Sequence, residues 1–136
     1  MKVVLDTNIV LRAISSKSEY AILLDELYLQ TFSIVVSTDI LLEYEEKITQ
    51  FFGKNSAEDF LNLLLLLPNV EKVETFFQLN IIQADPDDNK FVDCAFVGNV
   101  HSIVTDDKHF NILKEIDFPN IPVISAASFK KMILGL

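Results

Sequence analysis

The sequence predicts an α/β fold, specifically a three-layer α/β/α sandwich with a central parallel sheet. Short apolar runs rich in Val and Ile alternate with longer segments in which apolar residues recur at helical spacing. Several of these runs end abruptly on polar or acidic residues, as buried strands do. Strands that alternate with helices form parallel sheets covered on both faces. With 136 residues, the chain has about the length of one domain, and we expect a single domain over residues 1–136.

The first half of the chain contains two predicted strands and four predicted helices. In chain order, we expect a strand from Lys2 to the carboxylate at Asp6, helices at Ile9–Ile14 and Glu19–Gln30, a strand at Ser33–Ser37, a helix at Asp39–Phe52, and a helix that ends before Pro68. Ser37 or Thr38 is a candidate N-cap for the third helix, and Gly53 should end it. The run Ser56–Asp59 is similar to a capping box, which predicts the start of the fourth helix.

The second half contains the remaining three strands. We expect a strand within Val70–Phe77 or Leu79–Ile82, a helix from Asp85 to about Val97, a strand at Ser102–Thr105, a short helical segment at Phe110–Lys114, a strand at Pro122–Ser125, and a helix at Ala126–Leu134. Asp85 as a cap, followed by Pro86 and further acids in the first turn, favours a helix start at this point. Gly98 and Asn99 should end that helix.

The composition favours a compact cytoplasmic protein. Apolar residues make up 50% of the chain, with only three Gly and four Pro, which argues against disorder. The single cysteine, Cys94, excludes an internal disulfide and is typical of a reducing compartment. The first residues lack the pattern of a secretion signal, and the leucine-rich run at Leu63–Leu67 is too short to span a bilayer. We expect no membrane contact, and this leucine run forms either core or an interaction surface.

Acidic residues follow several predicted strands. Asp6 ends the first strand, Glu43 lies a little over one turn into the helix after the second, and Asp106 and Asp107 follow a later one. We also expect a strand to end shortly before Asp88. Because the carboxyl ends of parallel strands share one edge of the sheet, four acidic positions should converge there. They are Asp6, Glu43, Asp88, and one or both of Asp106 and Asp107.

Such a group of carboxylates predicts a site for Mg²⁺ or Mn²⁺. Crowded carboxylates repel one another unless a cation neutralises them, and oxygen ligands suit these two metals. One ion, or two ions about 4 Å apart, would activate water and stabilise the leaving oxygen of a phosphodiester. His101 and His109 are too few for a zinc site, and no glycine-rich nucleotide loop is present. His109 lies beside the predicted site, either as a surface residue or as a phosphate contact.

These motifs resemble those of the PIN-domain ribonucleases, especially their bacterial toxin-like (VapC-like) branch. The resemblance covers nearly the whole chain and rests on four segments, namely Asp6-Thr7-Asn8, Glu43, Asp85 to Phe91, and Val104 to Lys108. It implies a Mg²⁺- or Mn²⁺-dependent endoribonuclease that cleaves single-stranded RNA. It also implies a homodimer and an antitoxin protein as partner.

The resemblance implies a role for each matching residue. The catalytic metal ligands would be Asp6, Glu43, Asp88 and Asp107, and the polar residues that support them would be Asn8 and Thr105. Asn89 stands where this branch often has Asp, so either a ligand is lost or Asp88 takes its place. Asp106 occupies a variable position and is an alternative or additional metal ligand.

The formal charge of −9 opposes binding to a phosphate backbone. Lys90 and Lys108 lie nearest the motifs and are the candidate contacts to RNA phosphates. Two other functions remain open. The chain could be a catalytically inactive PIN-like module that binds a partner, or a phosphoryl-transfer domain of the receiver or phosphatase type. Receivers usually carry an acidic pair after the first strand and such phosphatases carry Asp-x-Asp, whereas this chain has Asn8 at the partner position.

Overall fold

The structure, a computed structural model, describes residues 1–136. Its five strands form one parallel sheet in the order β3-β2-β1-β4-β5. The strands are β1 (Lys2–Leu5), β2 (Ser33–Val36), β3 (Val70–Lys72), β4 (Ser102–Val104) and β5 (Val123–Ile124). The chain leaves β1 in one direction to form β2 and β3, and then returns to the other side of β1 to form β4 and β5. The order of the sheet therefore reverses between β1 and β4, and ligands of doubly wound sheets bind outside the carboxyl ends of the strands at such a point.

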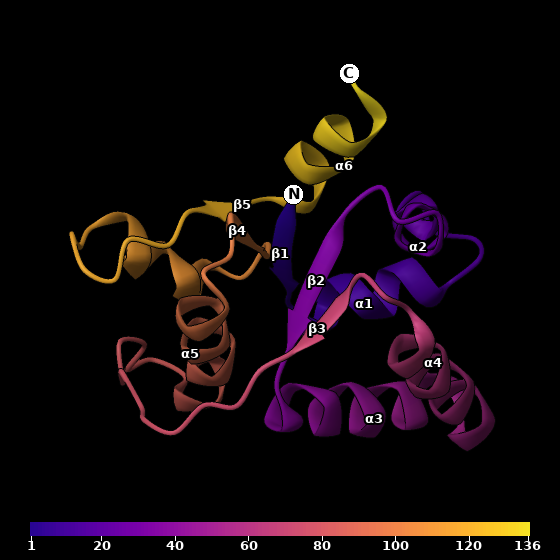
Figure 1. Cartoon of the computed structure of the whole chain (residues 1–136), viewed down its shortest axis with the longest axis horizontal. Helices are drawn as coiled ribbons and strands as arrows, with labels where there is room; N and C mark the ends of the chain where they lie inside the picture. The colour runs from indigo at the N-terminus through magenta and orange to yellow at the C-terminus, as the bar shows by residue number, and fades with distance from the viewer.

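Helices cover both faces of the sheet, which confirms the predicted three-layer sandwich (Figure 1). The α-helices are α1 (Thr7–Ile14), α2 (Ala21–Tyr28), α3 (Thr38–Phe52), α4 (Lys54–Leu66), α5 (Asn89–Gly98) and α6 (Ala126–Leu134), and the 3₁₀ helices are η1 (Pro86–Asp88) and η2 (Lys108–Lys114). In Figure 1, α5 lies to the left of the strands and α1 to α4 lie to the right or below. Crossover connections are right-handed, so connections that run in opposite directions place their helices on opposite faces.

The three inner strands, β2, β1 and β4, are buried almost completely, as their apolar sequences predict. Val3 pairs with Ile34 of β2 on one side and with Ser102 of β4 on the other, and its side chain is fully buried. Helix α5 comes close to the sheet at Gly98, where an added Cβ would lie 2.7 Å from the Cγ1 atom of Val35. This close packing holds α5 across the sheet, with η1 at its N-terminal end.

Most predicted elements are present, with ends that differ by a few residues. Ser37 is the N-cap of α3, since its Oγ accepts a hydrogen bond from the Ile40 N–H at 3.3 Å. Gly53, with φ of +93°, ends α3 as predicted. The capping box predicted at Ser56 is wrong, because α4 already begins at Lys54 and no side chain caps it.

The leucine-rich run belongs partly to the core and partly to the surface. Leu64 is buried in the core, whereas Leu65 and Leu66 are 68% and 80% exposed. Leu64 therefore fits the core interpretation, and Leu65 and Leu66 are available for the predicted interaction surface. No helix in the structure has both the length and the apolar character that a membrane-crossing segment needs.

The segment before α5 departs most from the prediction. Residues Val70–Lys72 supply the third strand, but Leu79–Ile82 form no strand, so the expected strand end before Asp88 is wrong. The predicted continuous helix from Asp85 is a 3₁₀ turn, η1, followed by α5. The start of α5, and not the end of a strand, brings Asp88 to the carboxyl edge of the sheet.

Two buried side chains of α5 hold this irregular segment in place. The Asn89 amide accepts a hydrogen bond from the Ile82 N–H and donates one to the Ile82 carbonyl, both at 2.8 Å. The Asp93 carboxylate accepts a hydrogen bond from the Leu79 N–H at 3.0 Å. Since only an amide can both donate and accept here, Asn89 has a structural reason to differ from Asp.

We predict that Asn89→Asp lowers the free energy of unfolding by about 1 to 3 kcal/mol, because the buried Ile82 carbonyl loses its donor. Urea unfolding followed by circular dichroism measures this change. Asn62→Asp adds the same charge at an exposed position of α4 and should leave the free energy nearly unchanged. Equal effects of the two substitutions would contradict the proposed role of the Asn89 amide.

Candidate metal centre

Asp6 lies at the end of β1, beside the end of β4. Its backbone N–H donates to the Val104 carbonyl at 3.0 Å, which ties the two strand ends together. Its side chain is only 5% exposed and accepts a hydrogen bond at Oδ2 from the Thr105 hydroxyl at 2.7 Å. The side chain does not cap α1. Asp6 is therefore a buried carboxylate at the point where the strand order reverses.

The turn after β4 separates the two neighbouring acids. The Thr105 Oγ1 accepts a hydrogen bond from the Asp107 N–H at 3.0 Å, so this one hydroxyl links Asp6 to the start of η2. Asp106 instead accepts hydrogen bonds from Arg12 at 2.8 Å and from the Ala126 N–H at 3.0 Å. The turn directs Asp107 toward the Asp6 side and Asp106 toward α1 and α6.

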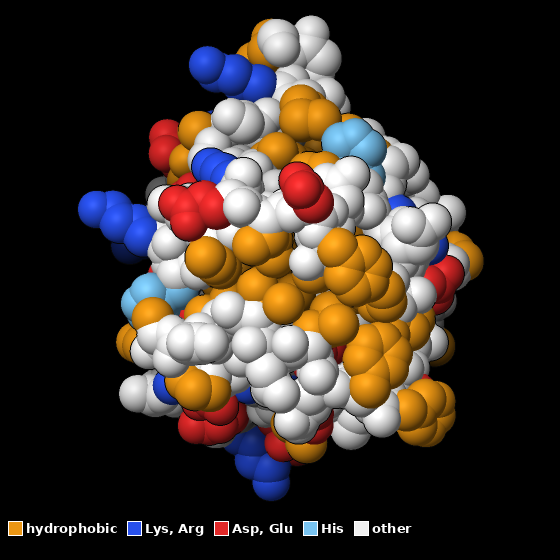
Figure 2. Space-filling model, turned by 90° about the vertical axis from the view of Figure 1, so that its left-hand side faces the viewer, with side chains coloured by type: hydrophobic (Ala, Val, Ile, Leu, Met, Phe, Trp, Pro, Cys, Tyr) orange, Lys and Arg blue, Asp and Glu red, His pale blue; other side chains and the backbone are white.

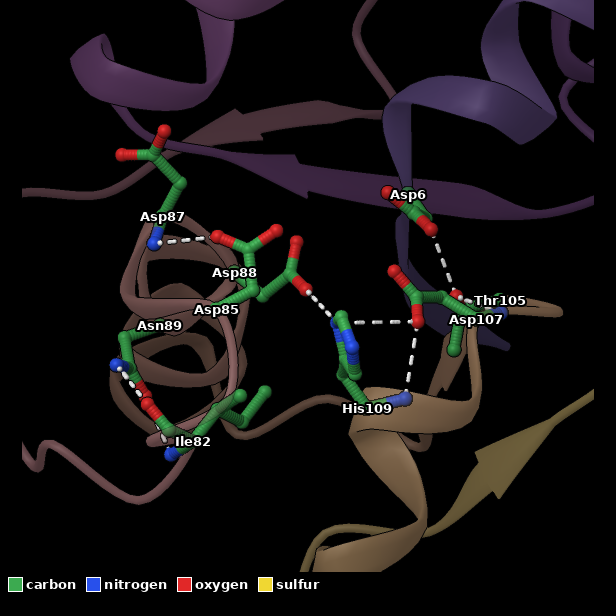
Figure 3. A network of polar contacts seen from close by, with 9 residues as sticks. All are labelled: Asp6, Ile82, Asp85, Asp87, Asp88, Asn89, Thr105, Asp107 and His109. Carbon is green, nitrogen blue, oxygen red and sulfur yellow. Dashed lines mark hydrogen bonds and ion pairs between the residues drawn. The ribbon is translucent and has the colours of Figure 1, made fainter.

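Asp88 and Asp107 approach each other from two elements that are distant in sequence (Figure 3). The imidazole of His109 lies between them, with Nδ1 at 3.3 Å from Oδ2 of Asp88 and 3.4 Å from Oδ1 of Asp107. Ligand atoms of Asp85, Asp88 and His109 all lie within 4.8 Å of one another. Sequence reasoning did not place Asp85 in this group or recognise the contacts of His109. The position of His109, only two residues after Asp107 in the same short turn, was the one sequence signal for a contact between His109 and the acids.

Glu43 is held between two partners. The Thr7 hydroxyl donates a hydrogen bond to its Oε2, and the Lys90 ammonium lies 2.7 Å from its Oε1. Both charged side chains are about four-fifths buried, at 18% exposure for Glu43 and 20% for Lys90. Lys90, a candidate phosphate contact, is therefore engaged by Glu43 in this structure.

The other candidate residues lie at the surface. Asn8 is exposed, and none of the hydrogen bonds in the structure involves its side chain. Lys108 is exposed as well and, together with Lys114, lines a recess of about 180 Å³ that begins at Thr105 and Asp107. The sequence alone does not point to Lys114, because this residue lies seven residues from Asp107, the nearest acid of the motif. Only the compact turn of η2 brings Lys114 to the same recess as Lys108.

The acidic side chains affect one another electrostatically. Burial, together with the charges of Asp85 and Asp107, raises the pKa of Asp88 to about 7, against the hydrogen bond from His109. Burial also raises the pKa of Asp6, and the charges of Asp107 and Glu43 act in the same direction, against the hydrogen bond from Thr105.

Asp106 behaves differently, because the hydrogen bonds from Arg12 and Ala126 outweigh its burial and lower its pKa.

The group formed by Asp6, Glu43, Asp88 and Asp107 carries an excess of negative charge that a cation would relieve. Hard oxygen ligands of this kind fit Mg²⁺ or Mn²⁺.

The sequence model of the PIN domain matches residues 2–109, a range that includes all four of these acids. The chain belongs to the PIN domain family. Membership of this family supports a nuclease activity for the chain. No curated protein matches the sequence.

Solved structures share the fold of this PIN domain. A chain of VapBC2 from Rickettsia felis, bound to a promoter DNA fragment, has a TM-score of 0.59 and is 20% identical, over 92% of this chain and 98% of that chain. A chain of DNA-bound VapBC from Salmonella typhimurium has a TM-score of 0.62 and is 17% identical, over 93% and 98% of the two chains. The PIN domain endonuclease Utp24 has a TM-score of 0.50 and is 18% identical, over 91% and 84%. At these identities, the likeness establishes the fold alone.

The topology of the PIN domain also excludes the receiver alternative. Receiver domains have the strand order 2-1-3-4-5, whereas this sheet has the order 3-2-1-4-5. In both arrangements the first strand ends in an acid at the edge where ligands bind. The other residues at that edge differ, because different strands become its neighbours.

We predict that the metal-free PIN domain loses stability as the pH rises. Asp88 has a pKa of about 7 in the folded chain against an ordinary value of 3.8, so between these values the folded state binds a proton that the unfolded state does not. Stability is therefore highest below about pH 4 with respect to this group and falls as the pH approaches 7. Asp88→Asn keeps the side chain neutral and should remove this part of the fall. Urea unfolding at several pH values, with divalent ions chelated, measures the effect.

Asp59→Asn is the control, because Asp59 is exposed on α4 and lies outside the acidic group. It should keep the full pH dependence of the wild type. Some dependence should also remain in Asp88→Asn, since the pKa of Asp6 is raised as well. If Asp88→Asn and the wild type show the same pH dependence, the burial and repulsion assigned to Asp88 are wrong.

Proposed function

We propose that this PIN domain is a Mg²⁺- or Mn²⁺-dependent endoribonuclease whose metal ligands are Asp6, Glu43, Asp88 and Asp107. The observation that supports the proposal is the mutual influence of these acids: the charges of Asp107 and Glu43 raise the pKa of the buried Asp6, and those of Asp107 and Asp6 raise the pKa of Asp88. The sequence resemblance to PIN-domain ribonucleases supports RNA as the substrate.

Bound metal ions in such sites activate water and stabilise the leaving oxygen of a phosphodiester. The side chains of the chain itself supply the positioning. Thr105 holds the Asp6 carboxylate, and Thr7 and Lys90 hold that of Glu43. His109 lies between Asp88 and Asp107 and so bridges η1 and the start of η2.

The basic side chains around the acids fit contacts to RNA phosphates. Lys108 and Lys114 line the recess beside Asp107, and Lys90 pairs with Glu43. With a formal charge of −9, the chain depends on such local groups and on bound cations for attraction to RNA. Binding should therefore weaken strongly as the salt concentration rises.

We further propose that the chain is the toxin component of a toxin-antitoxin pair, acts in the cytoplasm, and forms a homodimer. The sequence resemblance and the fold shared with chains of two VapBC complexes support this proposal. Exposed apolar surface provides room for protein partners. The rings of Phe77, Phe96 and Phe118 form an edge-to-face row, and Figure 2 shows an extended apolar area on the side of the molecule where α5 lies.

We predict that the purified protein cleaves single-stranded RNA when Mg²⁺ or Mn²⁺ is present, and that chelation abolishes cleavage. Asp6→Asn should lower the rate by more than about 100-fold, because loss of a mere supporting residue around a metal already costs 10- to 100-fold. Gel analysis of a labelled RNA oligonucleotide measures the rate. Asp107→Asn should have a larger effect than Asp106→Asn, since Asp106 is bound by Arg12 and Ala126.

Asp59→Asn, at an exposed position of α4, should retain the wild-type rate. Equal cleavage by Asp6→Asn and the wild type would indicate a contaminating nuclease and would remove the proposal.

Metal binding can be measured without cleavage. We predict that Mn²⁺ raises the melting temperature of the wild type and has a much smaller effect on Asp88→Asn, because ligands that bind only the folded state stabilise it. Differential scanning fluorimetry over a range of Mn²⁺ concentrations measures the shift. A wild-type protein that neither responds to Mn²⁺ nor cleaves RNA would instead be the inactive partner-binding module.

A further inference from the structure

A second recess adjoins the acidic site at His109. It has a volume of about 340 Å³ and is lined by Ile81, Ile82, Gln83, Ala84, His109 and Ile112. The lining comes from two segments that are distant in sequence, namely the irregular segment before α5 and the 3₁₀ helix η2. Figure 3 shows Ile82 and His109 from these two segments beside the acidic group.

We propose that this recess binds an unpaired nucleobase of the RNA strand, from a nucleotide next to the phosphate that is cleaved. This inference rests on the proposed function of the acidic site as a ribonuclease. It adds a specificity subsite, with Gln83, His109 and Ile112 as the residues that contact the base.

His109 connects the recess to the acidic site. Its Nδ1 lies within 3.4 Å of both Asp88 and Asp107, and the same side chain lines the recess. A nucleotide whose phosphate lies at the acids therefore has its base within reach of the recess. Histidine rings are among the side chains on which proteins stack unpaired bases.

The lining has the chemistry that a flat heterocycle needs. Isoleucine side chains supply apolar surface for the faces of the ring, and the exposed amide of Gln83 offers both a donor and an acceptor to its edge. Pockets that receive an unstacked base combine such apolar walls with a few hydrogen-bonding groups. The recess lacks the row of basic residues that a phosphate backbone alone would need.

Hydrogen bonds hold the backbone on both sides of the recess. The amide of Asn89 fixes the backbone of Ile82 through two hydrogen bonds of 2.8 Å. On the other side, the Asp107 carboxylate accepts a hydrogen bond from the His109 N–H at 2.9 Å, which fixes the start of η2. A preformed site binds with a smaller entropic cost than one that must order on binding.

Photocrosslinking tests the proposal directly. The non-cleaving Asp6→Asn variant is mixed with short single-stranded RNA that carries one 4-thiouridine at successive positions, and crosslinked peptides are identified by mass spectrometry. We expect crosslinks to residues 81–84 or 109–112 from one position in the strand. Crosslinks that map only to other parts of the chain would overturn the proposal. This readout requires no cleavage, so it decides the matter even if the ribonuclease proposal fails.

Base preference provides a second test. The rates of the wild type on RNAs that differ only in the base beside the cleaved bond should differ, and Gln83→Ala should reduce this difference by about tenfold, the value of one good hydrogen-bonded pair. Ile112→Ala should raise the KM for every base. Gln78→Ala, in the same segment but outside the recess, is the matched control and should keep the preference.

Each outcome separates the two proposals. If the wild type cleaves RNA no faster than Asp6→Asn, the ribonuclease proposal is contradicted. The crosslinks still report on the recess in that case. Unchanged base preference in Gln83→Ala, together with an unchanged KM in Ile112→Ala, contradicts the subsite alone. If Ile112→Ala instead changes the mass of the assembly in light scattering and leaves the crosslinks unchanged, the recess belongs to a protein interface and the proposal is overturned.

Discussion

Repulsion among carboxylates at the carboxyl edge of the sheet is the constraint on which the rest of the site depends. Burial and neighbouring charges raise the pKa values of Asp6 and Asp88, so the metal-free chain must compensate for charge that it cannot disperse into water. It does so with specific neighbours. Thr105 donates to Asp6, Lys90 pairs with Glu43, and His109 lies between Asp88 and Asp107. Each compensating group also holds its acid in position, which prepares the site for a cation.

The irregular segment before α5 connects this electrostatic site to the packing of the fold. Gly98 allows α5 to approach β2 closely, and α5 then presents Asn89 and Asp93 to the backbone of the segment. The same helix start positions Asp88 beside the end of β1. One helix therefore positions a proposed metal ligand and one wall of the adjoining recess, so packing changes in α5 should affect both together.

The strands and most helices could be predicted because their signals are local. Apolar runs identified the strands, and Ser37 and Gly53 marked the ends of α3. The capping box at Ser56 was wrong, and of the two candidates for the third strand only Val70–Phe77 supplies it, because similar local patterns also occur where tertiary contacts decide the backbone. The interactions of Asn89 could not be predicted, since its partner Ile82 belongs to an irregular segment without a recognisable pattern.

The sequence by itself determined that buried strands end on Asp6 and Thr105 and that the chain forms a parallel α/β sandwich, because these properties follow from periodicity and composition along the chain. Only the tertiary structure decided which of Asp106 and Asp107 joins the acidic group, since Arg12 and α6 engage Asp106 from distant parts of the sequence. It also decided that Lys90 pairs with Glu43 and that His109 borders both the acids and the recess. These outcomes depend on which strands become neighbours, and strand order is a property of the whole chain.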